Sequence, residues 1–167
     1  MSMIGEYARL TPAELDRAVR DPAWARQFVD ELIDTEPDEE PDASRARRHD
    51  VGKMWHALDF LLDRITFPVD VVHGEEKLPR APHWGYGPPR YLTPGRVRAA
   101  AEALTVTPHH ALTEGVGPAD LAEAGIYPHV VWERGEPLDH VTSHYQELVP
   151  FFQAAARAGD AVLIWLD

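Results

Sequence analysis

The stretch from residue 79 to residue 101 carries the side chains best suited to hold an anion. It contains no acidic residue but four arginines, Arg80, Arg90, Arg96 and Arg98. A guanidinium group beside the N-terminus of a helix favours a carboxylate or phosphate, because the free backbone N–H groups there also attract negative charge. Thr93 followed by Pro94 predicts such a helix start, since a capping hydroxyl precedes a proline at the first helical position.

Aromatic residues next to glycines in the same stretch can form one wall of a pocket. We therefore predict a binding site for a small anionic ligand in this stretch, with additions from a second aromatic segment further along the chain. The candidate lining residues are Tyr86, Arg90, Tyr91, Arg96, Tyr127 and Trp132. The prediction requires a concave pocket that holds at least two of these side chains. The alternative is that the arginines pair with acidic residues elsewhere or face water.

Histidines and carboxylates at helical spacing offer two weaker sites. His56 and Asp59 are three residues apart in an amphipathic segment and so share a helical face, which suits an acid/base pair or half a metal site. A solvated helix flank explains the same pattern. His140 and His144 have the spacing of metal ligands, but Val141 follows the first histidine where zinc motifs of this spacing carry glutamate. We predict neither a metal nor a cofactor.

The composition excludes several classes of protein. The chain has 167 residues, a formal net charge of −12 and no cysteine. The lack of cysteine rules out disulfides, thiolate zinc sites and cysteine nucleophiles. The acidic balance argues against nucleic acid, whose phosphates would repel the protein. No apolar run approaches a membrane span and the N-terminus does not read as a signal peptide, so we predict a cytoplasmic protein without membrane contact.

Acidic residues are concentrated in one segment. Residues 30–42 hold eight carboxylates and no basic side chain, and Pro37 and Pro41 keep the centre of this segment from forming a helix. We predict a mobile acidic loop at about residues 34–43. Such a surface is suited to a basic protein partner.

The elements expected to position these residues indicate one α+β domain over residues 1–167. Apolar spacing and capping signals predict helices at about 12–20, 22–33, 50–64, 94–104, 118–124 and 138–158, with Pro150 kinking or splitting the last. Strands are predicted near 1–10, 67–72, 90–92 and 161–166, with loops at 73–89 and 105–117 and an ambiguous segment at 126–132. The final apolar run is typical of a strand buried on both faces. The expected fold is α+β, with five or six helices around a small mixed sheet that includes this C-terminal strand.

Four stretches together resemble the YfbM-like family of bacterial proteins. They are MSMIGEYARLT, VGKMWHALDFLL, GYGPPRYLTPGRVRAAAEAL, and AGIYPHVVW followed by YQELVPFFQAAARAGDAVLIWL, in this order over nearly the whole chain. The resemblance implies one small cytoplasmic α+β domain and brings no established activity. Two positions depart from the family pattern. The chain starts with Met-Ser-Met rather than Met-Gly-Met, and Asp59 stands where a histidine is expected.

Two functions from different classes are consistent with the sequence. The first is a non-enzymatic binding or regulatory module that presents the acidic segment to a basic protein partner, in a complex that weakens as ionic strength rises. The second is a small-molecule binding protein or an enzyme, with an anionic ligand in the pocket around Tyr86, Arg90 and Tyr91. The acidic segment, the small size and the lack of a catalytic motif favour the first. The sequence defines neither the oligomeric state nor whether there is catalysis.

Overall fold

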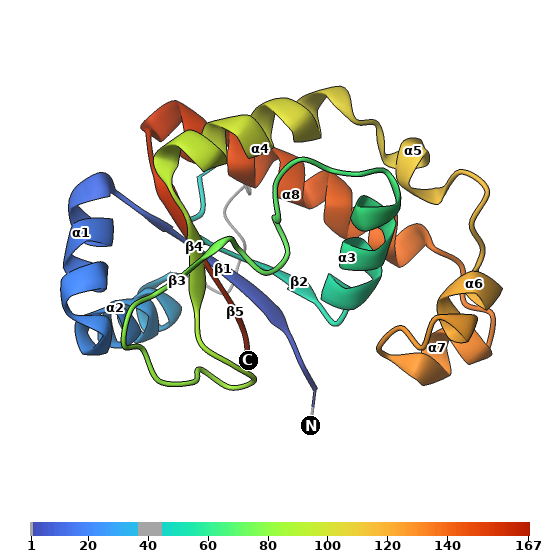
Figure 1. Ribbon diagram of the computed structural model, residues 1–167, viewed down its shortest axis with the longest axis horizontal. Helices are drawn as coiled ribbons and strands as arrows, with labels where there is room; N and C mark the ends of the chain where they lie inside the picture. The colour runs from blue at the N-terminus through green and yellow to red at the C-terminus, as the bar shows by residue number, and fades with distance from the viewer. Residues whose placement is uncertain (1, 37–44) are drawn as a thin grey trace.

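A five-stranded sheet with helices on both of its faces forms the framework of the molecule (Figure 1). The computed structural model describes residues 2–36 and 45–167. The strands are β1 (Gly5–Leu10), β2 (Arg48–Gly52), β3 (Glu76–Lys77), β4 (Arg90–Leu92) and β5 (Ala161–Leu166). The helices are α1 (Pro12–Arg20), α2 (Pro22–Thr35), α3 (Trp55–Arg64), α4 (Pro94–Val106), α5 (His109–Thr113), α6 (Pro118–Glu123), α7 (His129–Glu133) and α8 (Asp139–Ala158). The strand order is β2-β1-β5-β4-β3.

The α+β class and the C-terminal strand inside the sheet are confirmed. The sheet, however, is antiparallel at every strand pair of the described residues, where a mixed sheet was expected. Apolar periodicity reports which residues are buried but not which way a strand runs, and for this reason the direction was not predictable from spacing. The described residues form eight helices, of which five have nine or more residues.

Three helices begin as the sequence predicted, each with a capping side chain before a proline. The Glu14 amide donates to Thr11 Oγ1 at 3.2 Å, and the Glu14 carboxylate accepts from the Thr11 amide at 2.8 Å, which completes a capping box at α1. Asp21 caps α2 by accepting a hydrogen bond from the Trp24 amide. Thr93 caps α4 by accepting from the Arg96 amide. Local side-chain chemistry therefore fixes where these helices start.

The helix predicted at 50–64 was wrong at its start. Residues up to Gly52 belong to β2, and α3 begins only at Trp55. Val51 is fully buried, as the apolar stripe implied, but it is buried on a strand whose neighbours Asp50 and Gly52 pair with β1. A pairing partner more than forty residues away leaves no trace in local spacing.

The strand predicted at 67–72 was also wrong. Pro68 has no N–H to donate to a ladder, and one oxygen of the Asp70 side chain accepts from the amides of Val72 and His73 at 3.1 and 2.8 Å. The side chain thus supplies the bonds that a strand neighbour would have made. Elsewhere the differences are smaller: α8 runs unbroken through Pro150, β3 lies inside the predicted loop 73–89, α5 lies inside the predicted irregular segment 105–117, and α7 forms part of the ambiguous segment 126–132.

Two hydrophobic cores lie on opposite faces of the sheet, and β5 contributes to both. Val162 and Ile164 point into the first core, which α3, α4 and α8 cover. Leu163 and Trp165 point into the second core, against α1 and α2. Alternate residues of a strand face opposite sides, which explains why this strand reads as an unbroken apolar run.

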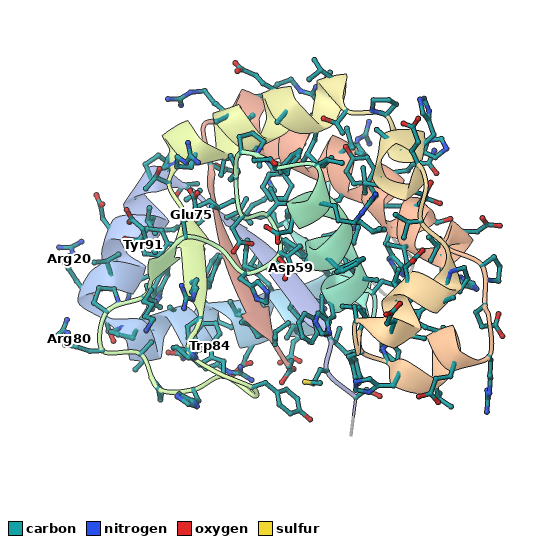
Figure 2. All side chains as sticks on the ribbon, turned by 45° about the vertical axis from the view of Figure 1, so that its right-hand side comes forward. Arg20, Asp59, Glu75, Arg80, Trp84 and Tyr91 are labelled. Carbon is teal, nitrogen blue, oxygen red and sulfur yellow. The ribbon has the colours of Figure 1, made fainter. Side chains whose placement is uncertain are left out.

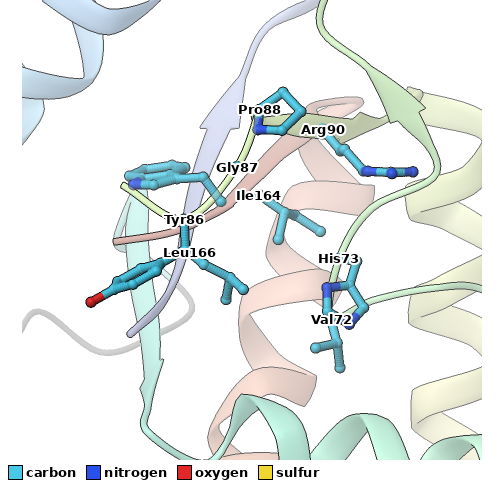
Figure 3. Close-up of a pocket in the computed structure, with 9 residues that line it drawn as sticks. Val72, His73, Tyr86, Gly87, Pro88, Arg90, Ile164 and Leu166 are labelled. Atoms are coloured by element: carbon cyan, nitrogen blue, oxygen red, sulfur yellow. The ribbon is translucent and has the colours of Figure 1, made fainter. Parts of the chain in front are cut away.

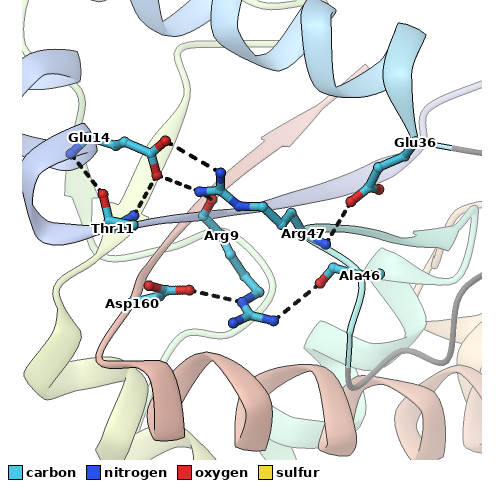
Figure 4. A network of polar contacts seen from close by, with 7 residues as sticks. All are labelled: Arg9, Thr11, Glu14, Glu36, Ala46, Arg47 and Asp160. Carbon is cyan, nitrogen blue, oxygen red and sulfur yellow. Dashed lines mark hydrogen bonds and ion pairs between the residues drawn. The ribbon is translucent and has the colours of Figure 1, made fainter.

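A network of charged side chains joins β1 to the segments before β2 and β5 (Figure 4). Arg9 Nε donates to Asp160 Oδ2 at 3.0 Å, and the two side chains are only 12% and 7% exposed. Arg47 forms an ion pair with Glu14 and donates to the Arg9 carbonyl at 2.9 Å. This network is structural, because its donors and acceptors are directed at one another and at the backbone.

The predicted acidic loop at 34–43 is described only in part. Asp34 lies in the last turn of α2, and the Glu36 carboxylate accepts a hydrogen bond from the Arg47 amide at 2.8 Å. Residues 37–43 lie outside the described residues. Among the helices that the structure describes, none combines the length and the apolar character needed to cross a membrane.

Candidate functional site

A depression of about 270 Å³ opens on the first-core face of the sheet, between β4, β5 and the loop before β3 (Figure 3). Its main lining residues are His73, Tyr86, Pro88, Arg90, Ile164 and Leu166. Ile164 and Leu166 form an apolar floor, Arg90 and His73 stand at one end, and Tyr86 lies at the other. We call this the Arg90 depression. It holds two of the predicted residues, Tyr86 and Arg90.

The strand register decides which neighbour of Arg90 reaches the depression. Arg90 lies opposite Ile164 and therefore shares its face of the sheet. Tyr91 lies opposite Leu163 and packs against the second core, on the side of α1 (Figure 2). The alternation of strand side chains therefore removes Tyr91 from the site predicted around it.

Two glycines allow the walls of the depression to approach the strands. Gly74 has a φ of +82°, and a Cβ there would lie 2.9 Å from the Arg90 Cβ. Gly85 has a φ of +64°, and a Cβ there would lie 2.6 Å from the Leu166 carbonyl oxygen. Only glycine fits such positions without strain. Gly74 thus brings its neighbour His73 beside Arg90, and Gly85 lets the Tyr86 amide donate to the Leu166 carbonyl at 3.0 Å.

His73 is held by an acidic partner on α3. Its Nε2 lies 3.5 Å from Asp59 Oδ2. This contact with the Asp59 carboxylate raises the pKa of His73, and it outweighs both the burial of the ring and the repulsion from Arg90. Trp55 packs its ring edge-to-face on His73, with centroids 5.8 Å apart. The imidazole is therefore held in place and keeps its proton to a higher pH than a free imidazole does.

His56 and Asp59 face different partners. His56 Nδ1 accepts a hydrogen bond from the Tyr127 amide at 2.9 Å, and the ring stacks on Trp55. Burial lowers the pKa of His56, so its ring favours the neutral form in which Nδ1 accepts. Asp59 instead pairs with His73. The acid/base pairing considered for these two residues is replaced by two separate interactions.

The other predicted lining residues lie outside the depression. Trp132 is 2% exposed in the first core. Tyr127 stacks on Trp55, and its hydroxyl accepts from the Met3 amide. Arg96 forms an ion pair with Glu75 at 2.7 Å and also donates to the Pro68 carbonyl. These contacts come from loop placement and helix packing, which the linear spacing does not encode.

Comparisons with known proteins agree with this fold and add no chemistry. A family described as a domain of unknown function, DUF1877, matches residues 1–165. The chain belongs to the DUF1877 family. A solved structure titled as a protein of unknown function, YfbM from Escherichia coli, has a TM-score of 0.64 at 19% identity, over 98% of this chain and 99% of that one. The predicted resemblance to YfbM-like proteins is therefore confirmed. No match was found among curated proteins.

His73 is the ionisable lining residue of this DUF1877 chain that the sequence analysis missed. It lies between an apolar run and Gly74, in a segment interpreted as a strand followed by a loop. The departure from the family pattern at Asp59 was the one signal that pointed toward it, because Asp59 is its partner in the structure. No local spacing connects residues 59 and 73.

His140 and His144, which have the spacing of metal ligands although no metal was predicted, lie in the described part of this DUF1877 chain. No cluster of three or more His, Cys, Asp or Glu side chains suited to a metal occurs there. His144 instead approaches Gly52, at the turn that ends β2.

Two ionisable residues of β1 and β2 are perturbed mainly by burial. Burial raises the pKa of Glu6 to about 7, and repulsion from Asp50 adds to the effect. Burial lowers the pKa of His49 to about 4, and the ring stacks on Phe151 with centroids 5.3 Å apart. Desolvation disfavours the charged form in both cases. His49 thus differs from His73, whose charge has a carboxylate partner.

Proposed function

We propose that this chain binds a small anion, a carboxylate or a phosphate, in the Arg90 depression. The observation that supports the proposal is that Arg90 borders this depression without an ion pair or a side-chain hydrogen bond to any described residue. Arg90 is half-buried. A guanidinium beside apolar walls attracts a carboxylate or phosphate strongly, because the local dielectric is below that of water.

The surrounding charges are arranged so that Arg90 stays available. Glu75 directly precedes β3. Its carboxylate accepts two hydrogen bonds from the Arg96 guanidinium, at 2.7 and 2.9 Å. Asp59 lies on α3 and is engaged by His73. Each of these carboxylates already has a cationic partner. An external anion is therefore the partner best suited to Arg90.

Anion binding can be tested by isothermal titration with acetate, benzoate and inorganic phosphate at low ionic strength. We expect saturable binding of at least one of these anions to the wild type. Arg90→Met removes the guanidinium and should weaken binding by about tenfold or more, as expected for a charge-assisted contact. Arg134→Met, at an exposed arginine of the α7 end, is the matched control and should bind like the wild type. Equal binding by the Arg90 variant, or no binding by the wild type, would contradict the proposal.

A second candidate function is the binding of a basic protein partner through the acidic end of α2. Asp30, Glu31 and Asp34 are exposed there, and of these only Asp30 has an ion pair among the described residues, with Arg26 at 3.3 Å. This chemistry predicts capture at low salt and release as ionic strength rises. The test is affinity capture over a salt series with the wild type and with a chain neutralised at all three positions. Capture that ignores both salt and neutralisation would exclude this candidate.

A further inference from the structure

The Arg90 depression is chemically divided. One end carries Arg90 and His73, and the floor and far end are apolar or aromatic, with Ile164, Leu166 and Tyr86 (Figure 3). Tyr86 is 43% exposed, so part of its side chain is accessible to a ligand. Inorganic anions would use only the cationic end. A carboxylate with an apolar body would use both ends, since apolar contact adds to the charge-assisted bond.

The charge on His73 depends on the groups that face it from three elements. Asp59 on α3 lies 3.5 Å from Nε2, and Asp70 in the same loop as His73 adds a second negative charge. Burial of the ring and Arg90 on β4 both oppose the proton. His56 on α3 also lies near His73, but burial lowers the pKa of His56 and so favours its neutral form. Two carboxylates therefore hold the proton against burial and one guanidinium.

An anion placed between Arg90 and His73 changes this balance. It neutralises the repulsion between the two cations and gives the imidazolium a second acceptor. The bound state then favours the proton on His73 more than the free state does, and by linkage the proton favours the bound anion equally. Asp59 acts as a positioning residue, because it contacts His73 rather than lining the depression.

We propose that the depression binds an organic carboxylate with an apolar body only when His73 carries its proton, and that Asp59 keeps this proton in place. This inference rests on the proposed anion-binding function. It predicts the strongest binding at low pH. Above the pKa of His73 the affinity should fall by about tenfold for each pH unit, as a strict requirement for one proton dictates.

The test is titration with benzoate from pH 6 to pH 9 at constant ionic strength, with acetate as the comparison lacking an apolar body. Wild type should bind benzoate more tightly than acetate and lose affinity as pH rises. Binding in buffers of different ionisation enthalpy should show proton uptake. Asp59→Asn should move the loss of affinity to lower pH, and the NMR titration of the His73 ring should move in the same direction. Asp63→Asn, one turn further along α3 and exposed without an ion pair to a described residue, should leave the profile unchanged.

The outcomes separate this inference from the function on which it rests. Benzoate binding that needs Arg90 but is constant from pH 6 to pH 9 would overturn the proton requirement and leave anion binding intact. Acetate binding as tight as benzoate, or phosphate binding without benzoate binding, would overturn the apolar-body requirement alone. A pH profile that Asp59→Asn leaves unmoved would overturn the role of Asp59. Failure of all three anions to bind would overturn both proposals.

Discussion

Two arginines rise from the same face of the sheet and have opposite surroundings. Arg9 on β1 lies opposite Val162, and Arg90 on β4 lies opposite Ile164. Arg9 is bound by the buried carboxylate of Asp160 and also donates to a backbone carbonyl. Arg90 borders an open depression and has no such partner among the described residues.

The contrast shows that a neighbouring loop or turn decides the role of an arginine on a strand. The arginine is structural where that segment places a carboxylate against it, and it is available to a ligand where the segment does not. The turn between α8 and β5 places Asp160 against Arg9. The loop before β3 places His73, whose pKa is raised by Asp59, near Arg90. Arg9 should therefore matter for folding, and Arg90 for binding. The predictions below test this division, from the largest expected effect on stability to the smallest.

Arg9→Met should destabilise the fold by about 3–5 kcal/mol, because it leaves the Asp160 carboxylate buried without its counter-charge. Urea unfolding followed by circular dichroism measures the change. The double variant Arg9→Met with Asp160→Asn should recover part of the loss, since no uncompensated charge then remains. A loss below about 1 kcal/mol in the single variant would mean that Arg9 is no more structural than a surface arginine.

His49→Phe should become more stable relative to wild type as pH falls. The folded-state pKa of His49 is lowered to about 4, below the unfolded value of about 6.5. The contribution of the neutral His49 ring to wild-type stability is therefore fully present above pH 6.5 and is lost as the pH falls toward 4. The difference between the two proteins should grow by about 3 kcal/mol over that window. Comparison with the variant is needed because Glu6, with its raised pKa, changes wild-type stability in the opposite direction. A constant difference between pH 7 and pH 4 would contradict burial as the cause.

Tyr7→Phe should cost about 1–3 kcal/mol, because the Tyr7 hydroxyl donates to the Val71 carbonyl at 2.7 Å and this acceptor is buried. The same carbonyl belongs to the loop that carries His73, so the His73 NMR signals should also shift. Tyr145→Phe removes a similar bond, to the Thr107 carbonyl, and serves as the control. It should destabilise by a similar amount without moving the His73 signals. An equal shift of the His73 NMR signals in both variants would show that the Tyr7 hydrogen bond has no specific effect on the depression.

Arg90→Met should change the free energy of unfolding by less than about 1 kcal/mol, because no described partner is left unpaired. The same variant should lose anion binding, as measured by titration calorimetry. Arg9→Met should show the reverse behaviour, with reduced stability and with anion binding retained at low temperature. A large stability loss in the Arg90 variant would place Arg90 in the structural class with Arg9.

Several features of the fold could be predicted because their causes are local. The capped starts at Thr11, Asp21 and Thr93 depend on side chains within three residues. The apolar run of β5 predicted a strand buried on both faces. The segment at 67–72 was misjudged because Asp70, a single side chain, replaced a strand neighbour.

The candidate site was predictable only in part. Tyr86 and Arg90 stood out because arginines and aromatics gather there without acidic residues. Tyr91 was included with them, and the register of β4 sends it to the opposite face. His73 was omitted, because its partner Asp59 is fourteen residues away on another element.

The sequence by itself determined the α+β class, the capped starts of α1, α2 and α4, the central C-terminal strand and the stretch that contributes Tyr86 and Arg90 to the depression. Helix caps and apolar periodicity depend on residues a few positions apart, so the elements that they define can be predicted from the sequence. Only the tertiary structure decided that the sheet is antiparallel, that Arg9 is paired, and that His73, Tyr86 and Arg90 share one depression. Those outcomes depend on strand register and on close approaches such as Gly74 to Arg90, which bring together residues that the sequence keeps apart.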